Sequence, residues 1–557
     1  MLKNCRNFYR RKKHKKEQSQ EHLIKNMMHI RFFIRETVNG FRLSSNVQSR
    51  AKSIKGCSVD SKITNIENKP QYIWPTKNIP GPKALSLLGN WFRFIPYIGE
   101  YSNADVMTQL RILHEQYGNI VKLDGLMNRR SCVFLFCPQL CEEMYHLTST
   151  SPIRIALETL HYYRKNRKHI YLDGQYGLAV NQGKIWRDFR TKVNPHMMQP
   201  QTVTTHVTQI SEVAIEFIEK IRALRDPKTL ELPNNFMNEL YKWSLESMCS
   251  IALGYRLGCL KPNLAMNSEP QIMINCVQDI FDLMYRLENL PSLWKIYNTR
   301  NLKKLIHALD TFDEISIKYI ERAKEKLREK TDSIDSQNHS VLEKLLRIDE
   351  KTAHIMALDM LLAGIDTTGN AAGGLLYYIA NNLKTQEKLR EEVMSVLPSK
   401  TSLVTHDILN RITYTKACIK ESMRLFPIVI GIQRTMQKDV SIKGYRIPAG
   451  MDVIACHALI SMESAQFPLP HEYIPERWLR DKTKFPLIKE PHPYAYMPFG
   501  YGMRTCIGRR FAEMELETLL LTIIRNFRIE WHHEPLKYKS QITNTLVLPM
   551  RFKFIDL

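Results

Sequence analysis

The stretch "PFGYGMRTCIGRRFAEMELETLLL", residues 498–521, constrains the fold of this 557-residue chain more than any other part of it. Gly500 and Gly502 permit a tight loop before Cys506, and Gly508 permits the close approach of another group after it. The residues that follow have apolar side chains at helical spacing, so the loop is expected to lead into a buried helix. A helix N-terminus carries partial positive charge, which favours the thiolate form of a cysteine. The stretch therefore predicts a metal-binding thiolate, with a buried free thiol as the alternative.

Helical periodicity dominates the rest of the chain, from residue 105 to residue 430. The pattern changes to strand, turn and strand over residues 440–458, and a second strand pair is expected over 119–125 and 132–138. We find no internal repeat. We therefore predict one large domain over residues 71–557, mainly α-helical with a small β region.

Composition excludes several classes of protein. The chain has no run of about 18 apolar residues, so a membrane-spanning helix is not expected. Its N-terminus has no apolar segment of the kind that directs secretion. The 11 cysteines are odd in number and include no CxxC pair. That pattern argues against a zinc ribbon or a disulfide framework and favours a reducing compartment.

The net charge of +24 is unevenly distributed. Residues 1–70 contain 17 Lys and Arg against 5 acidic residues, so this leader carries half of the excess. A nucleic-acid-binding protein would need such charge clustered on its folded body. We therefore do not expect nucleic acid as a partner.

The basic leader, residues 1–70, has the properties of a mitochondrial targeting segment. Within residues 27–42, Arg31, Arg35 and Arg42 share one face of a helix whose opposite face is apolar. The alternative is a basic tail without a targeting role. In both cases we expect the leader to be largely disordered.

An acid beside two alcohols interrupts the apolar helix predicted over residues 360–380. Burial of Asp366, Thr367 and Thr368 is costly unless each side chain finds a partner. A threonine hydroxyl can bond to the carbonyl four residues earlier and distort the helix, and we expect this distortion to open a groove beside Gly364. A kink in which every polar group is satisfied is the alternative to a functional site.

The motif around Cys506 resembles the haem-binding signature of the cytochromes P450, which it matches in full at Phe499, Gly502, Arg504, Cys506 and Gly508. The resemblance covers residues 72–557 and implies a cytochrome P450 fold, a single haem-binding domain with haem b as cofactor. It implies that the Cys506 thiolate is the proximal iron ligand and that Arg504 pairs with a haem propionate. Thiolate ligation donates electron density to the iron and favours O–O cleavage.

Other residues acquire roles from the same resemblance. Trp186 and Arg190 match a W-x-x-x-R motif that contacts a haem propionate, and Arg434 is placed like a further propionate arginine. Asp366 and Thr367 match an acid–alcohol pair that delivers protons during oxygen activation.

Glu421 and Arg424 lie three residues apart on a predicted helix. As an exposed pair they would contribute only about 0.3 kcal/mol. The resemblance instead implies that they form a triad with Arg477, which braces the haem loop. We interpret this triad as structural and not catalytic.

Four cations indicate one branch of the family. Lys416 and Lys420 lie four residues apart on one helical face, and Arg509 and Arg510 directly follow the haem loop. In the mitochondrial branch, cations at these places contact a small acidic ferredoxin. An ordinary solvated basic face is the alternative. Several other segments resemble insect mitochondrial cytochromes P450 of the group linked to xenobiotic metabolism.

The resemblance implies a monooxygenase that inserts one oxygen atom of O2 into an apolar small molecule, either a xenobiotic or an endogenous lipid or steroid. Electrons would come from NADPH through a reductase and an adrenodoxin-like ferredoxin. The expected location is the matrix side of the mitochondrial inner membrane, with peripheral association. The alternatives are an ecdysteroid-precursor hydroxylase of the same clan, an enzyme that rearranges peroxides, and a non-catalytic haem-binding protein.

Overall fold

The 32-residue helix α12 (Glu350–Asn381) is the element against which most other helices pack in the computed structural model. The structure describes residues 73–557 except 86–88, 96, 98, 103, 126–129, 168, 172–173, 263, 330–338, 482–489 and 548. The predicted targeting leader therefore lies outside the described residues. Residues 68–557 form one compact unit.

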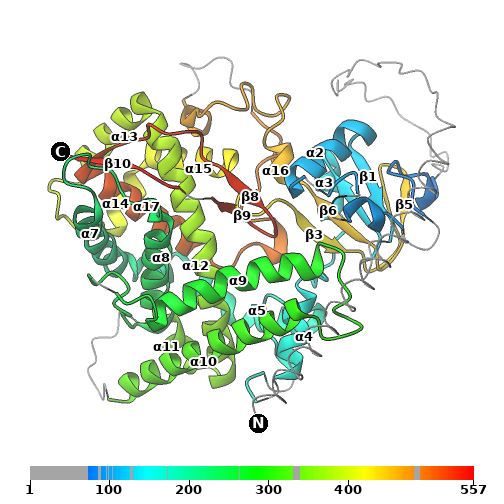
Figure 1. Cartoon of the computed structure of the whole chain (residues 1–557), viewed down its shortest axis with the longest axis horizontal. Helices are drawn as coiled ribbons and strands as arrows, with labels where there is room; N and C mark the ends of the chain where they lie inside the picture. The colour runs from blue at the N-terminus through cyan, green and yellow to red at the C-terminus, as the bar shows by residue number, and fades with distance from the viewer. Residues whose placement is uncertain are drawn as a thin grey trace, which may run out of the picture. The chain divides into compact units, whose positions relative to one another are not determined.

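Helices make up most of the described chain (Figure 1). Besides α12, the α-helices are α2 Val106–Tyr117, α3 Pro138–His146, α4 Glu158–Asn166, α5 Gly183–Met198, α6 Pro200–Thr204, α7 Val207–Leu224, α8 Phe236–Leu253, α9 Glu269–Glu288, α10 Arg300–Glu329, α11 Val341–Leu346, α13 Leu383–Val396, α14 His406–Arg411, α15 Thr413–Leu425, α16 His457–Ile460 and α17 Arg509–Asn526. Short 3-10 helices are η1 Thr76–Asn78, η2 Trp91–Phe94, η4 Pro475–Trp478 and η5 Gly502–Arg504.

The strands form a small β region. They are β1 Ile120–Leu123, β2 Cys132–Leu135, β3 Ile432–Thr435, β4 Val440–Ile442, β5 Tyr445–Ile447, β6 Asp452–Ala455, β7 Phe527–Glu530, β8 Tyr538–Ser540, β9 Asn544–Leu546 and β10 Lys553–Asp556. One sheet has the order β1-β2-β6-β3, and the pairs β10-β7, β4-β5 and β8-β9 stand separately. The two predicted strand regions are therefore confirmed, as is the mainly α fold class.

The four-stranded sheet combines segments that are far apart in the sequence. β2 pairs with β1 in the antiparallel and with β6 in the parallel direction, so that Val133 is the partner of both Lys122 and Val453. Val133 and Val453 are fully buried. In Figure 1 this sheet lies with α2 and α3 on one side of the molecule, while α7, α8, α13 and α17 lie on the other.

Glycines let α12 approach its neighbours closely. A Cβ atom at Gly364 would lie 2.5 Å from Cε of Met248 on α8, and one at Gly369 would lie 2.6 Å from Cδ1 of Tyr241. Both distances are too short for any larger side chain without repacking. The expected groove beside Gly364 is therefore wrong, because this face of the helix is filled by α8. Among the described residues, no helix is long and apolar enough to cross a membrane.

A buried carboxylate joins α15 to the segment that leads into the Cys506 loop. Glu421 accepts hydrogen bonds from Nη2 of Arg424 at 2.8 Å, from Nε of Arg477 at 3.1 Å and from Nε1 of Trp478 at 2.9 Å. The ring of Trp478 lies 4.4 Å from that of Tyr496, whose hydroxyl donates to the carbonyl of Lys420. The predicted triad is thus present as a structural unit that reaches the residues just before the loop.

Replacing Arg424 with methionine should reduce the free energy of unfolding by about 3–5 kcal/mol, because it removes one partner of a fully buried carboxylate. The exposed pair Arg446–Asp439 is the matched control. Its loss in Arg446→Met should cost less than about 1 kcal/mol. Urea unfolding followed by far-UV circular dichroism measures both. Equal losses in the two variants would contradict the structural role of the triad.

Candidate active site

The loop that carries Cys506 depends on two glycines with left-handed backbone. Gly500 has φ 75° and Gly502 has φ 72°, which side chains with a Cβ atom rarely adopt. The loop closes when the Cys506 amide donates to the carbonyl of Phe499 at 2.8 Å. Helix α17 begins three residues after the cysteine, with Gly508 at its N-cap. The predicted loop, helix start and cysteine therefore occur together.

The Cys506 side chain is exposed, unlike most cysteines of the described residues. Burial of the surroundings nevertheless raises the pKa of its thiol, and the Gly508 amide and the guanidinium groups of Arg190 and Arg509 act in the opposite direction. The helix end thus contributes as predicted, but it does not outweigh desolvation. Coordination to a metal ion deprotonates a thiol, so a metal bound at this sulfur would overcome the remaining effect of burial.

Four arginines gather beside the cysteine loop. The pKa of Arg504 is lowered to about 8, first by burial and then by the like charges of Arg154, Arg434 and Arg190. None of the four pairs with a carboxylate of the described residues. Within the described residues, Nε of Arg434 and Nε of Arg154 are both buried and have no hydrogen-bond partner. Such a cluster is costly unless an anion joins it.

Backbone carbonyls and one aromatic ring hold Arg504 in place. Its Nε donates to the carbonyl of Pro152 at 2.7 Å, and its Nη2 donates to that of Asn181 at 2.9 Å. The guanidinium lies 4.2 Å from the ring centroid of Trp186, within the range of a cation–π contact. These contacts fix the orientation of the arginine without neutralising its charge.

The site fits the haem that the sequence resemblance implies. One exposed thiol is available for iron, and the unpaired guanidinium groups suit the two propionates of the ring. No group of three or more His, Cys, Asp or Glu side chains that could hold a metal ion occurs among the described residues, so Cys506 lacks the further protein ligands that zinc needs. Arg154 was missed from the sequence, because no motif surrounds it and only the fold brings it to this cluster.

The middle of α12 has one open face. Ala363 is exposed and Thr367 is half-buried, although Leu362, Gly364 and Ile365 between them are buried. The Thr367 hydroxyl donates to the Ala363 carbonyl at 2.7 Å, the back-bond predicted from the sequence. The two side chains lie one turn apart and therefore border the same opening.

The carboxyl group of Asp366 is directed elsewhere. Only 2% of Asp366 is exposed, and its oxygens accept from Nδ2 of Asn370 at 3.1 Å and from Oγ1 of Thr543 at 3.3 Å. Burial raises the pKa of this carboxyl to about 6, against the hydrogen bonds from Thr543, Asn370 and Tyr241. Among the described residues Asp366 and Thr367 share no side-chain hydrogen bond, so the structure places the predicted pair side by side but on different faces.

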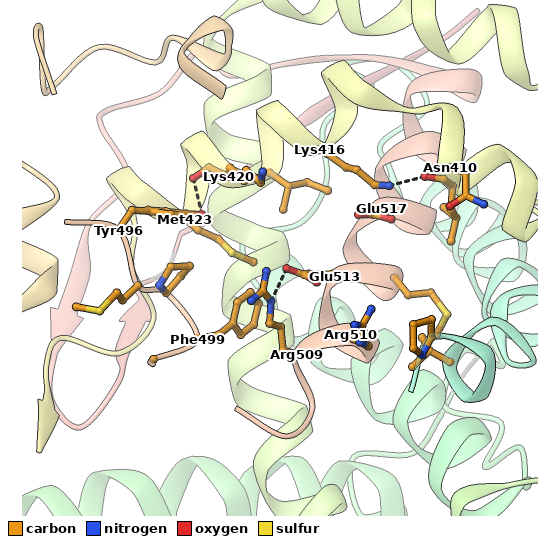
Figure 2. A pocket seen from close by; sticks show the side chains of 18 of the residues that line it. Asn410, Lys416, Lys420, Met423, Tyr496, Phe499, Arg509, Arg510, Glu513 and Glu517 are labelled. Atoms are coloured by element: carbon orange, nitrogen blue, oxygen red, sulfur yellow. Dashed lines mark hydrogen bonds and ion pairs between the residues drawn. The ribbon is translucent and has the colours of Figure 1, made fainter. Parts of the chain in front are cut away.

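The four predicted docking cations line one groove of about 460 Å³. Figure 2 shows Lys416 and Lys420 on α15 facing Arg509 and Arg510 on α17 across this groove. Lys416 is half-buried and its Nζ donates to the carbonyl of Leu409 at 2.5 Å. Phe499 also lines the groove, which therefore lies directly behind the loop of Cys506.

Two acids in the same groove were not predicted. Glu513 accepts from Nε of Arg509 at 2.9 Å and so offsets that cation. Burial raises the pKa of Glu517 to about 7, while Lys416 and Lys420 act to lower it. The sequence signal was available, since Glu513 and Glu517 follow Arg509 at intervals of four residues along one helix.

Comparisons with known proteins agree with this geometry. The family model "Cytochrome P450" matches residues 79–554. "Probable cytochrome P450 12a5, mitochondrial" of Drosophila melanogaster is 38% identical over 88% of this chain and 93% of its own length. "Cytochrome P450 CYP12A2" of Musca domestica is 36% identical over 90% of this chain and 95% of its own length. The crystal structure of the cytochrome P450DA heme domain has a TM-score of 0.67 at 18% identity and covers 87% of this chain and 98% of that one, which shows a shared fold.

Replacing Arg154 with glutamine should have opposite effects on two measurements. It relieves repulsion among buried cations, so the apoprotein should unfold at a higher urea concentration. It also removes a donor to an anionic ligand, so affinity for haemin should fall by about tenfold. Haemin titration followed by absorbance checks the second effect.

Arg187→Gln, at an exposed position on the same helix as Arg190, is the control and should change neither value. Unaltered haemin affinity in Arg154→Gln would remove Arg154 from the anion site.

Proposed function

The chain belongs to the cytochrome P450 family and is therefore a monooxygenase with haem-thiolate iron that uses O2, and on this premise we propose a specific reaction and set of partners. One oxygen atom is inserted into an apolar small molecule and the other leaves as water. Electrons come from NADPH through a ferredoxin reductase and an adrenodoxin-like ferredoxin. The observation that carries the proposal is the exposed Cys506 thiol beside four arginines that pair with no carboxylate of the described residues.

The proposed cofactor site uses the residues around the loop. Cys506 ligates the iron of haem b, and Arg504, Arg434 and Arg190 bind its propionates. The bound haem supplies oxygen activation, helped by the electron density of the thiolate. Trp186 orients Arg504 through the stacking contact at 4.2 Å.

The residues that shape the loop have a separate role. The carbonyl of Phe499 accepts a hydrogen bond from the amide of Cys506, and Gly502 supplies the left-handed turn. The amide of Gly508 donates toward the sulfur. A Cβ atom at Gly508 would lie 4.0 Å from Sγ of Cys506. The triad of Glu421, Arg424 and Arg477 holds the preceding segment in place and takes no part in the chemistry.

We assign proton delivery to Asp366 and Thr367. The Thr367 hydroxyl stands on the open face of α12 and donates its proton to the Ala363 carbonyl, so its oxygen can accept a hydrogen bond from a water that carries the delivered proton. Asp366 is buried with a pKa near 6, so it can both hold and release a proton close to neutral pH. Because the two side chains share no hydrogen bond among the described residues, transfer between them requires a turn of the Asp366 side chain or an intervening water.

The groove behind the loop is proposed as the ferredoxin site. Lys416, Lys420, Arg509 and Arg510 line it and complement an acidic partner. Met423 contributes an apolar side chain to the lining of the same groove. The location supports electron transfer, since Phe499 lines the groove and its carbonyl accepts from the amide of Cys506.

We place the protein in mitochondria, on the matrix side of the inner membrane and peripherally associated with it. Support comes from the basic leader over residues 1–70, which we propose precedes the haem domain at 71–557, and from the mitochondrial relative of Drosophila melanogaster. Ile296 and Tyr297, between α9 and α10, are 74% and 57% exposed and could enter a lipid surface.

The substrate class is proposed to be xenobiotic, with an ecdysteroid precursor as the second candidate. The support is the similarity to insect enzymes of the same family. Turnover by the haem-loaded protein with a mitochondrial ferredoxin system, screened against insecticides and ecdysteroid precursors, separates the two candidates.

The reduced carbon monoxide complex should show the Soret band of a thiolate-ligated haem, and Cys506→Ser should abolish it. Cys137→Ser is the matched control, because that half-exposed thiol lies outside the site and should leave the spectrum unchanged. An imidazole-type spectrum in the wild-type protein would refute the assignment.

Reversing the charge of Arg510 or Lys420 to glutamate should weaken ferredoxin binding at least about tenfold, since each change places a like charge against the acidic partner. Surface plasmon resonance at several salt concentrations measures the effect, which should diminish as salt rises.

Lys228→Glu is the control for this docking site. Helix α7 starts at the groove with Val207 and leads away from it, and Lys228 is an exposed residue just after the other end of that helix. The variant lies away from the groove and should bind ferredoxin normally. Glu517→Gln should act in the opposite direction and tighten binding above pH 7, where the carboxyl is ionised. Equal behaviour of Arg510→Glu and Lys228→Glu would move the docking site elsewhere.

A further inference from the structure

Hydrogen bonds tie the hairpin of β8 and β9 to two segments of the fold outside α12. The amide of Asn544 donates to the carbonyl of Ile428 at 2.8 Å, and its Nδ2 donates to that of Pro427 at 2.7 Å. Nε2 of Gln541 donates to Oδ1 of Asp282 on α9 at 3.1 Å. The turn between the strands is therefore a fixed structure and not a free loop.

The same hairpin reaches the buried acid of α12. Oγ1 of Thr543 donates to Oδ2 of Asp366 at 3.3 Å, and the amide of Leu546 donates to Oδ1 of Asn370 at 2.9 Å. Thr543 is 5% exposed and Asn370 is fully buried. Two hydrogen bonds thus connect the hairpin to one turn of the helix, and one of them ends on the carboxyl group itself.

Among the described residues, the side chains that donate hydrogen bonds to Asp366 are all uncharged. Thr543 approaches from the hairpin, Tyr241 from α8, and Asn370 from the next turn of α12. Tyr241 is the one titratable group among them, and burial keeps its phenol neutral by raising its pKa. No Lys, Arg or His of the described residues acts on this carboxyl group. A buried carboxylate without a cation relies on hydrogen-bond donors for its orientation and its charge.

We propose that Thr543 is a positioning residue for proton delivery: its hydroxyl holds the carboxyl group of Asp366 on the packed side of α12, against the hairpin. The inference rests on the proposed role of Asp366 and Thr367. It explains why the acid is turned from the open face on which Thr367 stands. Release of this bond leaves the carboxyl group with Asn370 and Tyr241 as its remaining donors and removes its tie to the hairpin.

The hydroxyl of Thr543 stabilises the charged form of Asp366, since it donates to the carboxylate. Its removal in Thr543→Val should raise the pKa of Asp366 by about one unit. At pH 7 the variant would then carry more protonated acid than the wild-type protein, whose pKa is about 6. Thr543→Ser keeps the donor and should restore the wild-type value.

The experiment uses the haem-loaded full chain. The infrared band of the protonated carboxyl group is titrated with pH and assigned to Asp366 by its loss in Asp366→Asn. In parallel, NADPH is oxidised through ferredoxin and its reductase, and the fraction of consumed O2 recovered as hydrogen peroxide is measured across the same pH range. Faulty proton delivery should raise that fraction, and its pH midpoint should follow the infrared titration.

Ser540→Ala is the matched control within the hairpin. Ser540 is 2% exposed and donates to Oδ1 of Asn544 at 2.7 Å, so this variant loses a buried hydrogen bond without touching Asp366. The proposal expects both pH midpoints to rise in Thr543→Val, to return in Thr543→Ser and to stay unchanged in Ser540→Ala. Identical midpoints in Thr543→Val and Ser540→Ala would overturn it.

Asp366→Asn separates this failure from that of the proposed function. If this variant releases no more hydrogen peroxide than the wild-type protein, Asp366 has no part in proton delivery, and the role of Thr543 falls with it. If it releases more while Thr543→Val behaves as wild type, the acid acts without Thr543, and only the positioning role is refuted.

Discussion

The site depends on uncompensated positive charge. Arg154, Arg190, Arg434 and Arg504 come together beside one cysteine, with no carboxylate of the described residues among them. Burial, together with repulsion from the other three cations, lowers the pKa of Arg504 to about 8, and both effects oppose folding. The haem that we propose for this site would offset that cost with its two propionates, and its iron would bind the sulfur as a thiolate. The proposed cofactor would then contribute to the stability of the fold.

Much of this arrangement could be predicted from sequence because it depends on local spacing. The glycines around Cys506 specify a loop through their backbone freedom, and Arg509 begins the next helix. The triad was also predictable, since Glu421 and Arg424 share one helix and their third partner belongs to a short recognisable segment. In these cases a few neighbouring residues carry both the structure and its signal.

Other features depend on contacts between distant segments, and there the sequence reasoning was incomplete or wrong. Arg154 and Arg504 are 350 positions apart in the sequence but lie in the same cluster, and no local sequence pattern predicts their proximity. The groove expected beside Gly364 is occupied by Met248 of α8, because a glycine can serve close packing as well as an opening. The exposed side chain is Ala363, one residue earlier. Hydrophobic periodicity predicts that a helix is buried, but the neighbouring helices determine which of its turns remains exposed.

Arg509 belongs to two electrostatic environments at once. It lowers the pKa of the Cys506 thiol, and its side chain also lines the groove on the far side of the loop. A substitution at this position would change the pKa of the thiol and the proposed docking surface together. Lys420 lies on another helix and is not among the main influences on the pKa of that thiol. Selection could therefore adjust the strength of the proposed partner binding through Lys420, whereas a change at Arg509 would also alter the sulfur.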